Sequence, residues 1–156
     1  MSFSEAAWLQ ADRLAQRGKF DSNSIVLDLG SGTGINSLML ARKYGCKVLG
    51  VDIATGMTTY AREQLHKAYN QDIKSNVFFY NGTIESLVED TLDGTLSIEF
   101  PDLFQDGPHK FTHLWSTCTL FQIRRESRIN VFDNFAHIAT EAARLVVDDA
   151  FCPNKV

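Results

Sequence analysis

The sequence predicts an α/β domain built on a parallel sheet, because short apolar runs alternate with segments of helical periodicity. The apolar runs, which we expect to be buried strands, cover residues 24–29, 46–51, 76–80, 111–116 and 145–150. Strands that alternate with helices are joined by right-handed crossovers. At 156 residues the chain is long enough for a hydrophobic core, and we expect residues 1–156 to form one domain.

The first predicted helix covers residues 2–18. Ser2 and Glu5 have the spacing of a capping box, apolar residues share one face, and Gly18 would end the helix. A second helix is expected over residues 36–44, directly after the first strand.

A third helix is predicted to begin at Thr55, which can cap it, with Met57 and Tyr60 on its apolar face. Residues 128–144 show a strong helical pattern that leads into the fifth strand. Residues 87–110 have no clean period, and we expect them to form a long acidic excursion.

Composition and charge narrow the possible partners. The net charge is −4, and residues 71–110 contain eight acidic residues but only two lysines. A surface that follows nucleic-acid phosphates needs the opposite sign, so nucleic acid is not an expected partner. No apolar run approaches membrane-spanning length and no secretory signal is evident, so the chain is predicted to be cytoplasmic without a membrane partner.

The three cysteines, Cys46, Cys118 and Cys152, are odd in number and far apart. They contain no Cys-x-x-Cys pair, so they indicate reduced thiols rather than a disulfide framework, and we expect no metal site.

The most informative stretch is residues 26–34, where a strand runs into Asp28 and then into three alternating glycines. A loop without bulky side chains at a helix N-terminus lets a large ligand lie against unpaired backbone N–H groups. Asp52, which ends the next apolar run, is placed to accept hydrogen bonds from both hydroxyls of a ribose. Together these features predict a nucleoside cofactor, although the glycines could serve only the turn and Asp52 could cap a helix.

The spacing of the glycines separates the cofactor classes. A nicotinamide site usually has Gly-x-Gly-x-x-Gly, whereas Gly30, Gly32 and Gly34 form Gly-x-Gly-x-Gly. Asp28, two residues earlier, would repel a pyrophosphate but suits a cationic ammonium group. The sequence has no Gly-Lys-Ser or Gly-Lys-Thr, which excludes a P-loop for nucleoside triphosphates.

Residues 25–62 resemble the core of the class I S-adenosylmethionine-dependent methyltransferases, whose loop reads Asp-x-Gly-x-Gly-x-Gly. The resemblance implies that Asp28 and the three glycines hold the methionine end of the cofactor and that Asp52 holds the ribose. Residues 43–48 and 114–116 are similar to small-molecule N- and C-methyltransferases that act on sarcosine, phosphoethanolamine, tocopherol or sterols.

The resemblance implies a Rossmann-like open parallel sheet of order 3-2-1-4-5 with helices on both faces. It implies S-adenosyl-L-methionine as cofactor and methyl transfer to the N, O or C atom of a small-molecule acceptor, which would approach over residues 116–122 under the first helix. The implied cofactor contacts are Asp28, Gly30, Ser31, Gly32, Gly34, Asp52, Ile53, Met57, Thr83, Ile84 and Ser116.

Three positions depart from the family pattern. Thr83 follows Gly82 at the position where the family commonly has an acid that contacts the adenine amine. Cys118 and Gln122 occupy the two positions where related enzymes often have an acid or Asn and then a His. The third departure is at the fifth strand, which lacks a preceding Gly-Gly turn and the closing antiparallel strands. We therefore expect a truncated form, a second chain that covers the edge, as in a homo-oligomer, or a poorly active protein.

No catalytic nucleophile is predicted, because the sulfonium cofactor is already an activated methyl donor. His109 and His113 are the candidate general bases by residue type. His113 alternates with Phe111 and Trp115, which favours a hydrogen-bonded structural histidine. The alternatives that stay open are a cofactor-binding module without activity and an NAD(P)-dependent oxidoreductase.

Overall fold

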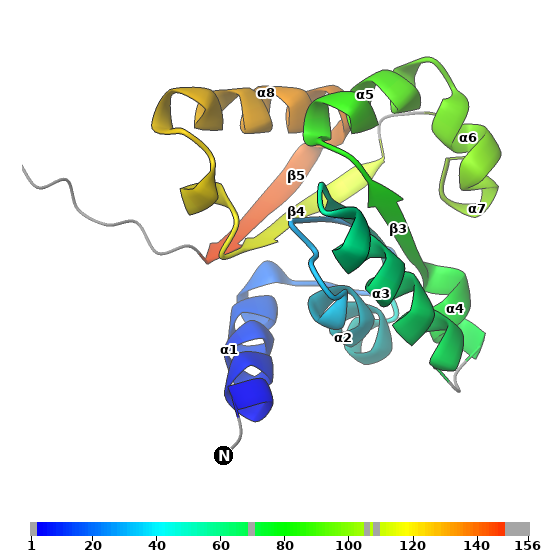
Figure 1. Ribbon diagram of the computed structural model, residues 1–156, viewed down its shortest axis with the longest axis vertical. Coiled ribbons are helices and arrows are strands. Elements are labelled where there is room, and N and C mark those ends of the chain that lie inside the picture. The colour runs from blue at the N-terminus through cyan, green and yellow to red at the C-terminus, as the bar shows by residue number, and fades with distance from the viewer. Residues whose placement is uncertain (1–2, 69–70, 105–106, 108–109, 149–156) are drawn as a thin grey trace, which may run out of the picture.

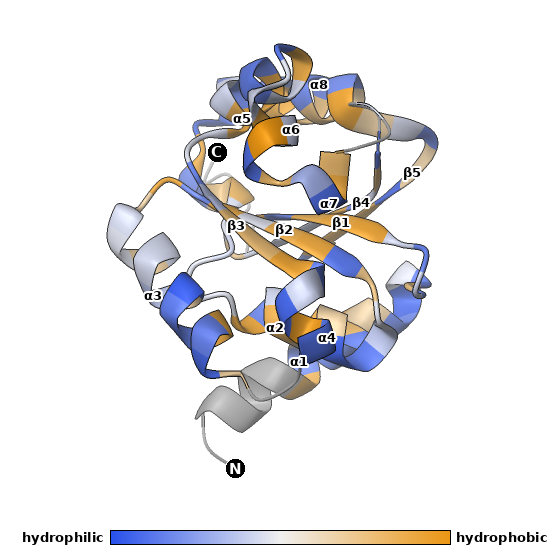
Figure 2. Cartoon of the chain, turned by 90° about the vertical axis from the view of Figure 1, so that its right-hand side faces the viewer, coloured by the Kyte–Doolittle hydropathy of each residue, from blue (hydrophilic) through white to orange (hydrophobic). Residues whose placement is uncertain are grey.

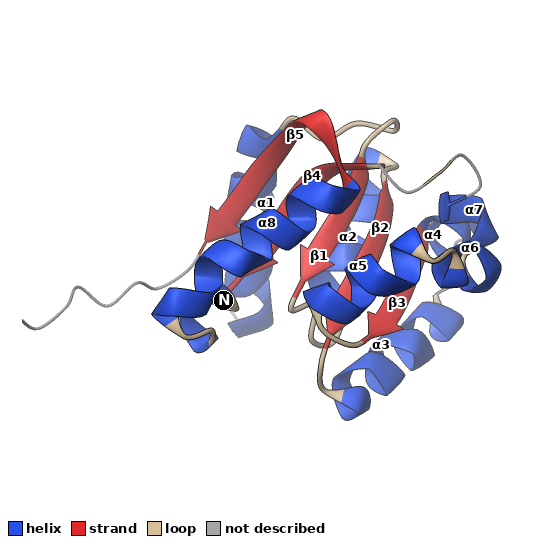
Figure 3. Cartoon of the chain, turned by 90° about the horizontal axis from the view of Figure 1, so that it is seen from above, coloured by secondary structure: helices blue, strands red, loops and turns tan. Residues whose placement is uncertain are grey.

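The computed structural model describes residues 3–68, 71–104, 107 and 110–148, with side chains from Leu9 onward. Its core is a five-stranded sheet in which every neighbouring pair is parallel, in the order β3-β2-β1-β4-β5, which confirms the predicted order (Figures 1 and 3). The strands are β1 (Ile25–Leu29), β2 (Lys47–Asp52), β3 (Val77–Asn81), β4 (Phe111–Thr117) and β5 (Ala139–Asp148).

Helices cover both faces of the sheet, also as predicted (Figure 2). On one face lie α1 (Phe3–Gly18), α2 (Ile35–Tyr44), α3 (Thr55–Lys67) and α4 (Gln71–Asn76). On the other lie α5 (Ile84–Leu92), α6 (Thr95–Glu99), α7 (Pro101–Phe104) and α8 (Arg128–Ile138). In the described part of the chain, no helix has the length and apolar character needed to cross a membrane.

Two hydrophobic cores explain why the strand sequences are almost continuously apolar. Successive residues of a strand point to opposite faces, and both faces of this sheet are buried. On β1, Val26 packs with Trp115 and the residues of α1 and α2, while Leu27 packs with Leu114 and the residues of α5 and α8. The central position of β1, between β2 and β4, follows from this double burial.

The acidic excursion predicted over residues 87–110 is wrong, because this stretch contains the end of α5, all of α6 and α7, and short connections. Thr83 and Ser86 cap α5 reciprocally through side chain and backbone. The buried residues Ile84, Leu87 and Val88 have helical spacing. The helix is missed in the prediction because the predicted excursion begins at Leu87 and so separates Ile84 from the other two residues.

The boundary between the last helix and the last strand also differs from the prediction. The helix predicted to reach residue 144 ends at Ile138, whose carbonyl accepts a hydrogen bond from the Lys110 N–H group. β5 begins at Ala139, opposite Phe111, and its register shifts before Arg144 pairs with His113. Pairing with β4 therefore overrides the helical pattern, and residues 149–150 of the predicted strand lie outside the described residues.

The helix α3 begins at Thr55, as predicted, but its cap is a third correction. Ala54, not Thr55, is the N-cap residue, and the Thr55 hydroxyl instead donates to the Asn81 side chain. The apolar face predicted from Met57, Tyr60, Ala61, Leu65 and Ala68 is right in part: Ala61 is fully buried and Leu65 packs against the core, but Met57 is 46% exposed and the polar Thr58 is buried. The short helix α4 was not predicted, and the expected Ser2 cap lies outside the described residues.

His113 is a buried structural residue, as its alternation with core residues predicts. Its Nε2 lies 2.9 Å from the Gly18 carbonyl oxygen and its Nδ1 lies 2.8 Å from the Thr112 hydroxyl. Burial lowers the pKa of the imidazole, so the neutral ring is favoured. These contacts join the end of α1 to the sheet and leave His113 no catalytic role.

We predict that His113→Phe destabilises the fold by about 1–3 kcal/mol, because the buried Gly18 carbonyl loses its partner. Denaturant unfolding measures this change in the free energy of unfolding. His66→Phe, at an exposed position of α3, is the matched control and should change it by less than about 0.5 kcal/mol. Equal stability of the two variants would contradict the structural role of His113.

Candidate functional site

The glycine loop between β1 and α2 is attached to the end of β2 by its backbone. The N–H groups of Gly30 and Ser31 both donate to the Val51 carbonyl, at 2.8 and 3.0 Å. Within the loop, the Gly34 N–H donates to the Ser31 carbonyl at 2.9 Å. The loop is thus a fixed turn, and its glycines are needed in part because all three have positive φ.

Asp52, at the end of β2, holds the middle of this loop. Its Oδ2 accepts a hydrogen bond from the Gly32 N–H and its Oδ1 accepts one from the Ala54 N–H, both at 2.8 Å. Each carboxylate oxygen accepts more than one hydrogen bond, so both retain lone pairs for ligand hydroxyls. The carboxylate is only partly buried and reaches the cavity described next.

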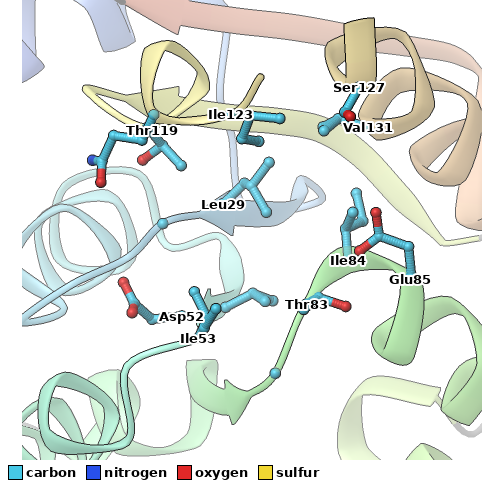
Figure 4. A pocket seen from close by; sticks show the side chains of 14 residues that line it. Leu29, Asp52, Ile53, Thr83, Ile84, Glu85, Thr119, Ile123, Ser127 and Val131 are labelled. Atoms are coloured by element: carbon cyan, nitrogen blue, oxygen red, sulfur yellow. The ribbon is translucent and has the colours of Figure 1, made fainter. Parts of the chain in front are cut away.

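A cavity of about 390 Å³ lies at the carboxyl ends of the strands, beside the point where the strand order reverses between β1 and β4. Open α/β sheets bind ligands at this place. Figure 4 shows Asp52 and Ile53 across the cavity from Thr119 and Ile123, with Leu29 between them. The lining residues are Leu29, Gly30, Val51, Asp52, Ile53, Gly82, Thr83, Ile84, Glu85, Thr119, Gln122, Ile123, Ser127 and Val131.

Five of the residues that the sequence assigned to cofactor binding line this cavity: Gly30, Asp52, Ile53, Thr83 and Ile84. They come from three separate strand ends, which supports one shared site. The Ile53 side chain is 75% exposed, an unusual position for a large apolar residue unless a ligand covers it.

The structure places the other assigned residues around the cavity rather than on its wall. Met57 is 46% exposed and Gly32 is half-buried, whereas Ser31 and Gly34 are buried within the loop; none of the four lines the cavity. The Ser116 side chain is fully buried, and its hydroxyl has no hydrogen-bond partner among the described residues.

Asp28 lies beneath the loop and is 1% exposed, so it supports the loop instead of facing the cavity. The Ser37 hydroxyl donates to its Oδ2 at 2.6 Å. The pKa of Asp28 is raised to about 7, mainly by burial; the Ser37 hydrogen bond opposes this rise and the nearby negative charge of Asp52 adds to it. A protonated Asp28 can accept the Ser37 hydroxyl while adding no charge to the core.

Nine lining residues were not assigned by sequence reasoning. Thr119 and Gln122 fall in the segment expected beneath the acceptor, while Gly82 and Glu85 flank the assigned Thr83 and Ile84. Ile123, Ser127 and Val131 come from the turns before α8 and from its first residues, and no motif identifies them. Leu29 and Val51 are strand ends whose apolar character indicates only burial.

The charge of the cavity is uniform in sign. Its lining includes the acids Asp52 and Glu85, and none of the lining residues that the structure describes is a Lys or Arg. A cavity of this kind favours a cationic or neutral ligand over one that carries phosphates.

The two departures after β4 do not supply a general base. Cys118 has a φ of 55°, which few residues other than glycine adopt, and its carbonyl accepts from the Gln122 amide at 2.8 Å. His109 lies outside the described residues.

The two cysteines that the structure describes are both free thiols. Cys118 is exposed, whereas Cys46 is buried. Burial raises the pKa of the Cys46 thiol to about 12. Cys152 lies outside the described residues.

Comparisons with known proteins agree with this geometry. A family model described as a methyltransferase domain matches residues 26–107, just over half of the chain. That match contains the glycine loop and the ends of β2 and β3. No curated protein matches the chain in sequence.

Solved structures share the fold at low sequence identity. A Haemonchus contortus phosphoethanolamine N-methyltransferase 2 in complex with S-adenosyl-L-methionine is 19% identical with a TM-score of 0.67, over 90% of this chain and 27% of its own. A putative sarcosine dimethylglycine methyltransferase from Galdieria sulphuraria is 20% identical with a TM-score of 0.66, over 89% and 46%. An RNA methyltransferase from Salinibacter ruber with S-adenosyl-L-homocysteine is 19% identical with a TM-score of 0.57, over 83% and 67%.

We predict that Asp28 makes the fold less stable as pH rises from about 4 to about 7. The folded-state pKa, about 7, lies above the ordinary aspartate value of 3.8, so between these pH values the native state binds a proton that the unfolded chain has released. The loss amounts to roughly 4 kcal/mol over this interval. Urea unfolding at a series of pH values gives the free energy of unfolding of the parent chain and of Asp28→Asn. The difference between the two should change by this amount between about pH 4 and pH 7, and a constant difference would contradict the prediction.

We also predict that Gly34→Ala destabilises the fold more than Gly32→Ala. Both positions have positive φ, but an added Cβ at Gly34 would lie 2.5 Å from the Phe79 ring, whereas nothing lies within 4 Å at Gly32. The left-handed conformation costs each variant about 1–2 kcal/mol, and overpacking adds about 1–3 kcal/mol at Gly34 alone. Denaturant unfolding compares the pair, and a larger loss at Gly32 would refute the packing argument.

Proposed function

The chain belongs to the methyltransferase domain family, and we propose that it transfers a methyl group from S-adenosyl-L-methionine to a small-molecule acceptor. The observation that carries the proposal is the Asp52 carboxylate, fixed against the glycine loop at the mouth of the cavity. The chain spans about a quarter of the length of the Haemonchus enzyme, so the activity of a whole protein is part of the proposal.

The cavity fits the chemistry of this cofactor. S-adenosyl-L-methionine carries a sulfonium, an ammonium and a carboxylate on its methionine part and a neutral nucleoside, so it is a net cation without phosphate. The lining supplies carboxylates and apolar side chains, and none of its described residues is basic. The Gly-x-Gly-x-Gly spacing of Gly30, Gly32 and Gly34 supports the sulfonium cofactor against the NAD(P)-dependent alternative, whose loop usually reads Gly-x-Gly-x-x-Gly.

Each part of the site has a proposed task. The backbone of residues 30–34 would hold the methionine end, and Asp52 would accept hydrogen bonds from the ribose hydroxyls. Ile53, Thr83 and Ile84 would enclose the adenine with apolar surface and backbone groups. The assignments of Asp28, Ser31, Met57 and Ser116 as further cofactor contacts stay predictions, with Asp28 acting from beneath the loop.

The cofactor supplies an activated methyl group, so the chain's task is to hold the acceptor in line and to exclude water. The acceptor is proposed to approach along residues 116–122, where Thr119 and Gln122 line the cavity. The Gln122 amide is bonded to the Cys118 carbonyl, so it positions the segment rather than moves a proton. The acceptor atom, N, O or C, is left open.

Further expectations stay with this proposal. The acceptor is a small molecule rather than nucleic acid, in keeping with the acidic cavity, although one structural neighbour is an RNA methyltransferase. The cytoplasmic location expected from the sequence stays a prediction. A cofactor-binding module without turnover is the second candidate, and it is favoured by the replacement of the family's acid and His by Cys118 and Gln122.

We predict that the chain binds S-adenosyl-L-methionine and S-adenosyl-L-homocysteine, and that Asp52→Ala weakens binding at least tenfold by removing two charge-assisted hydrogen bonds (roughly 1.4 kcal/mol or more). Titration calorimetry measures both affinities. Asp133→Ala, at an exposed position on α8, is the matched control and should bind like the parent chain.

The outcomes separate the candidates. Binding followed by methylation in a panel of amines, phenols and carbon acids supports the proposed reaction, whereas binding without turnover favours the binding module. Stabilisation by a nicotinamide cofactor but not by S-adenosyl-L-methionine would overturn the proposal.

A further inference from the structure

Asn81, the last residue of β3, lies beside Asp52 in the register of the sheet but is not part of the cavity wall. Its side-chain amide contacts two other elements. The Nδ2 group donates to the Asp52 carbonyl at 2.8 Å, and Oδ1 accepts from the Thr55 hydroxyl at 2.9 Å. Nδ2 also lies 3.5 Å from the hydroxyl of Thr58, which is buried. One half-buried side chain therefore joins the end of β3 to the end of β2 and to α3.

The Asn81 contact completes the anchoring of the backbone around Asp52. The peptide group before Asp52 is held through the Val51 carbonyl, which accepts from two N–H groups of the glycine loop. The peptide group after Asp52 is held through its own carbonyl, which accepts from the Asn81 amide and from the Gly82 N–H at 3.1 Å. Because peptide groups are planar, fixing both of them fixes the direction in which the Asp52 side chain leaves the backbone.

Asn81 also holds the turn that follows β2 at both of its ends. It contacts the carbonyl of the first residue, Asp52, and the side chain of the fourth, Thr55. Between them, the Ala54 N–H donates to the Asp52 Oδ1 at 2.8 Å. The position of this N–H group depends on the path of the turn, so the orientation of the carboxylate depends on it as well. A preorganised carboxylate of this kind needs supporting groups that do not touch the ligand themselves.

We propose that Asn81 is a positioning residue for the cofactor, which holds the turn after β2 so that the Asp52 carboxylate faces the ribose hydroxyls. The inference rests on the proposed function, because it takes Asp52 as the ribose ligand. Asn81 acts through Asp52 and not on the cofactor directly, since its side chain does not line the cavity. The effect of losing Asn81 must therefore depend on the presence of the Asp52 carboxylate.

Titration calorimetry with S-adenosyl-L-homocysteine tests this dependence in two backgrounds. In the parent chain, Asn81→Ala should weaken binding about three- to tenfold, which is the change expected for the loss of one hydrogen bond. In Asp52→Ala, the same substitution should weaken binding by less than about twofold, because no carboxylate is left to position. A merely structural role of Asn81 would give the same factor in both backgrounds.

Asn134→Ala is the matched control. The Asn134 amide also donates to a backbone carbonyl at 2.8 Å, that of Asn130, but it does so on α8 and is not part of the cavity wall. This variant should bind S-adenosyl-L-homocysteine like the parent chain.

Thr55→Val is a second variant that keeps the shape of an exposed side chain and removes only its hydrogen bond to Asn81. It should show the same dependence on Asp52 with a smaller factor, and it decides the question if circular dichroism shows that Asn81→Ala does not fold. Unchanged affinities, or equal factors in the two backgrounds, would overturn the inference and leave the proposed function standing. A folded parent chain that does not bind S-adenosyl-L-homocysteine would overturn both.

Discussion

The hydrogen bonds of the Asp52 carboxylate are the constraint on which the site depends. One oxygen fixes Gly32 and the other fixes the backbone after β2, so a single side chain sets the distance between two strand ends. The Val51 carbonyl reinforces this connection by accepting from Gly30 and Ser31. A ligand that bridges the loop and β2 therefore meets a preformed surface, and the cost of ordering the chain on binding is small.

A second carboxylate explains how the loop is supported from below. Asp28 is buried, has Ser37 as its partner, and lies near enough to Asp52 for the charge of Asp52 to raise its pKa. Two ionised carboxylates around one loop would repel each other in a region of low dielectric constant, so protonation of the inner one removes the conflict. A cation bound above the loop would act in the opposite direction, lowering the pKa of Asp28 and binding more tightly as pH rises.

The sequence was sufficient for the parts of the fold and site that local rules determine. Buried parallel strands give continuous apolar runs, and three glycines with an acid before them mark a strand-to-helix turn, so the parallel sheet, Gly30 and Asp52 could be predicted. The order of the strands came from the resemblance to the class I methyltransferases. Tertiary pairing could not: β5 takes residues 139–144 from a helical pattern because β4 offers them hydrogen bonds. Ile123 and Val131 line the cavity only through the path of the turns before α8, which no spacing encodes.

β5 and the cavity are connected through the end of β4. The Cys118 N–H donates to the Asp148 carbonyl, the Cys118 carbonyl accepts from Gln122, and the Thr117 hydroxyl accepts from Asn36 of α2. The segment after β4 thus begins from a strand end that β5 holds on one side and α2 holds on the other. Because Thr119 and Gln122 of this segment line the cavity, the contacts with β5 and α2 fix the position of one cavity wall.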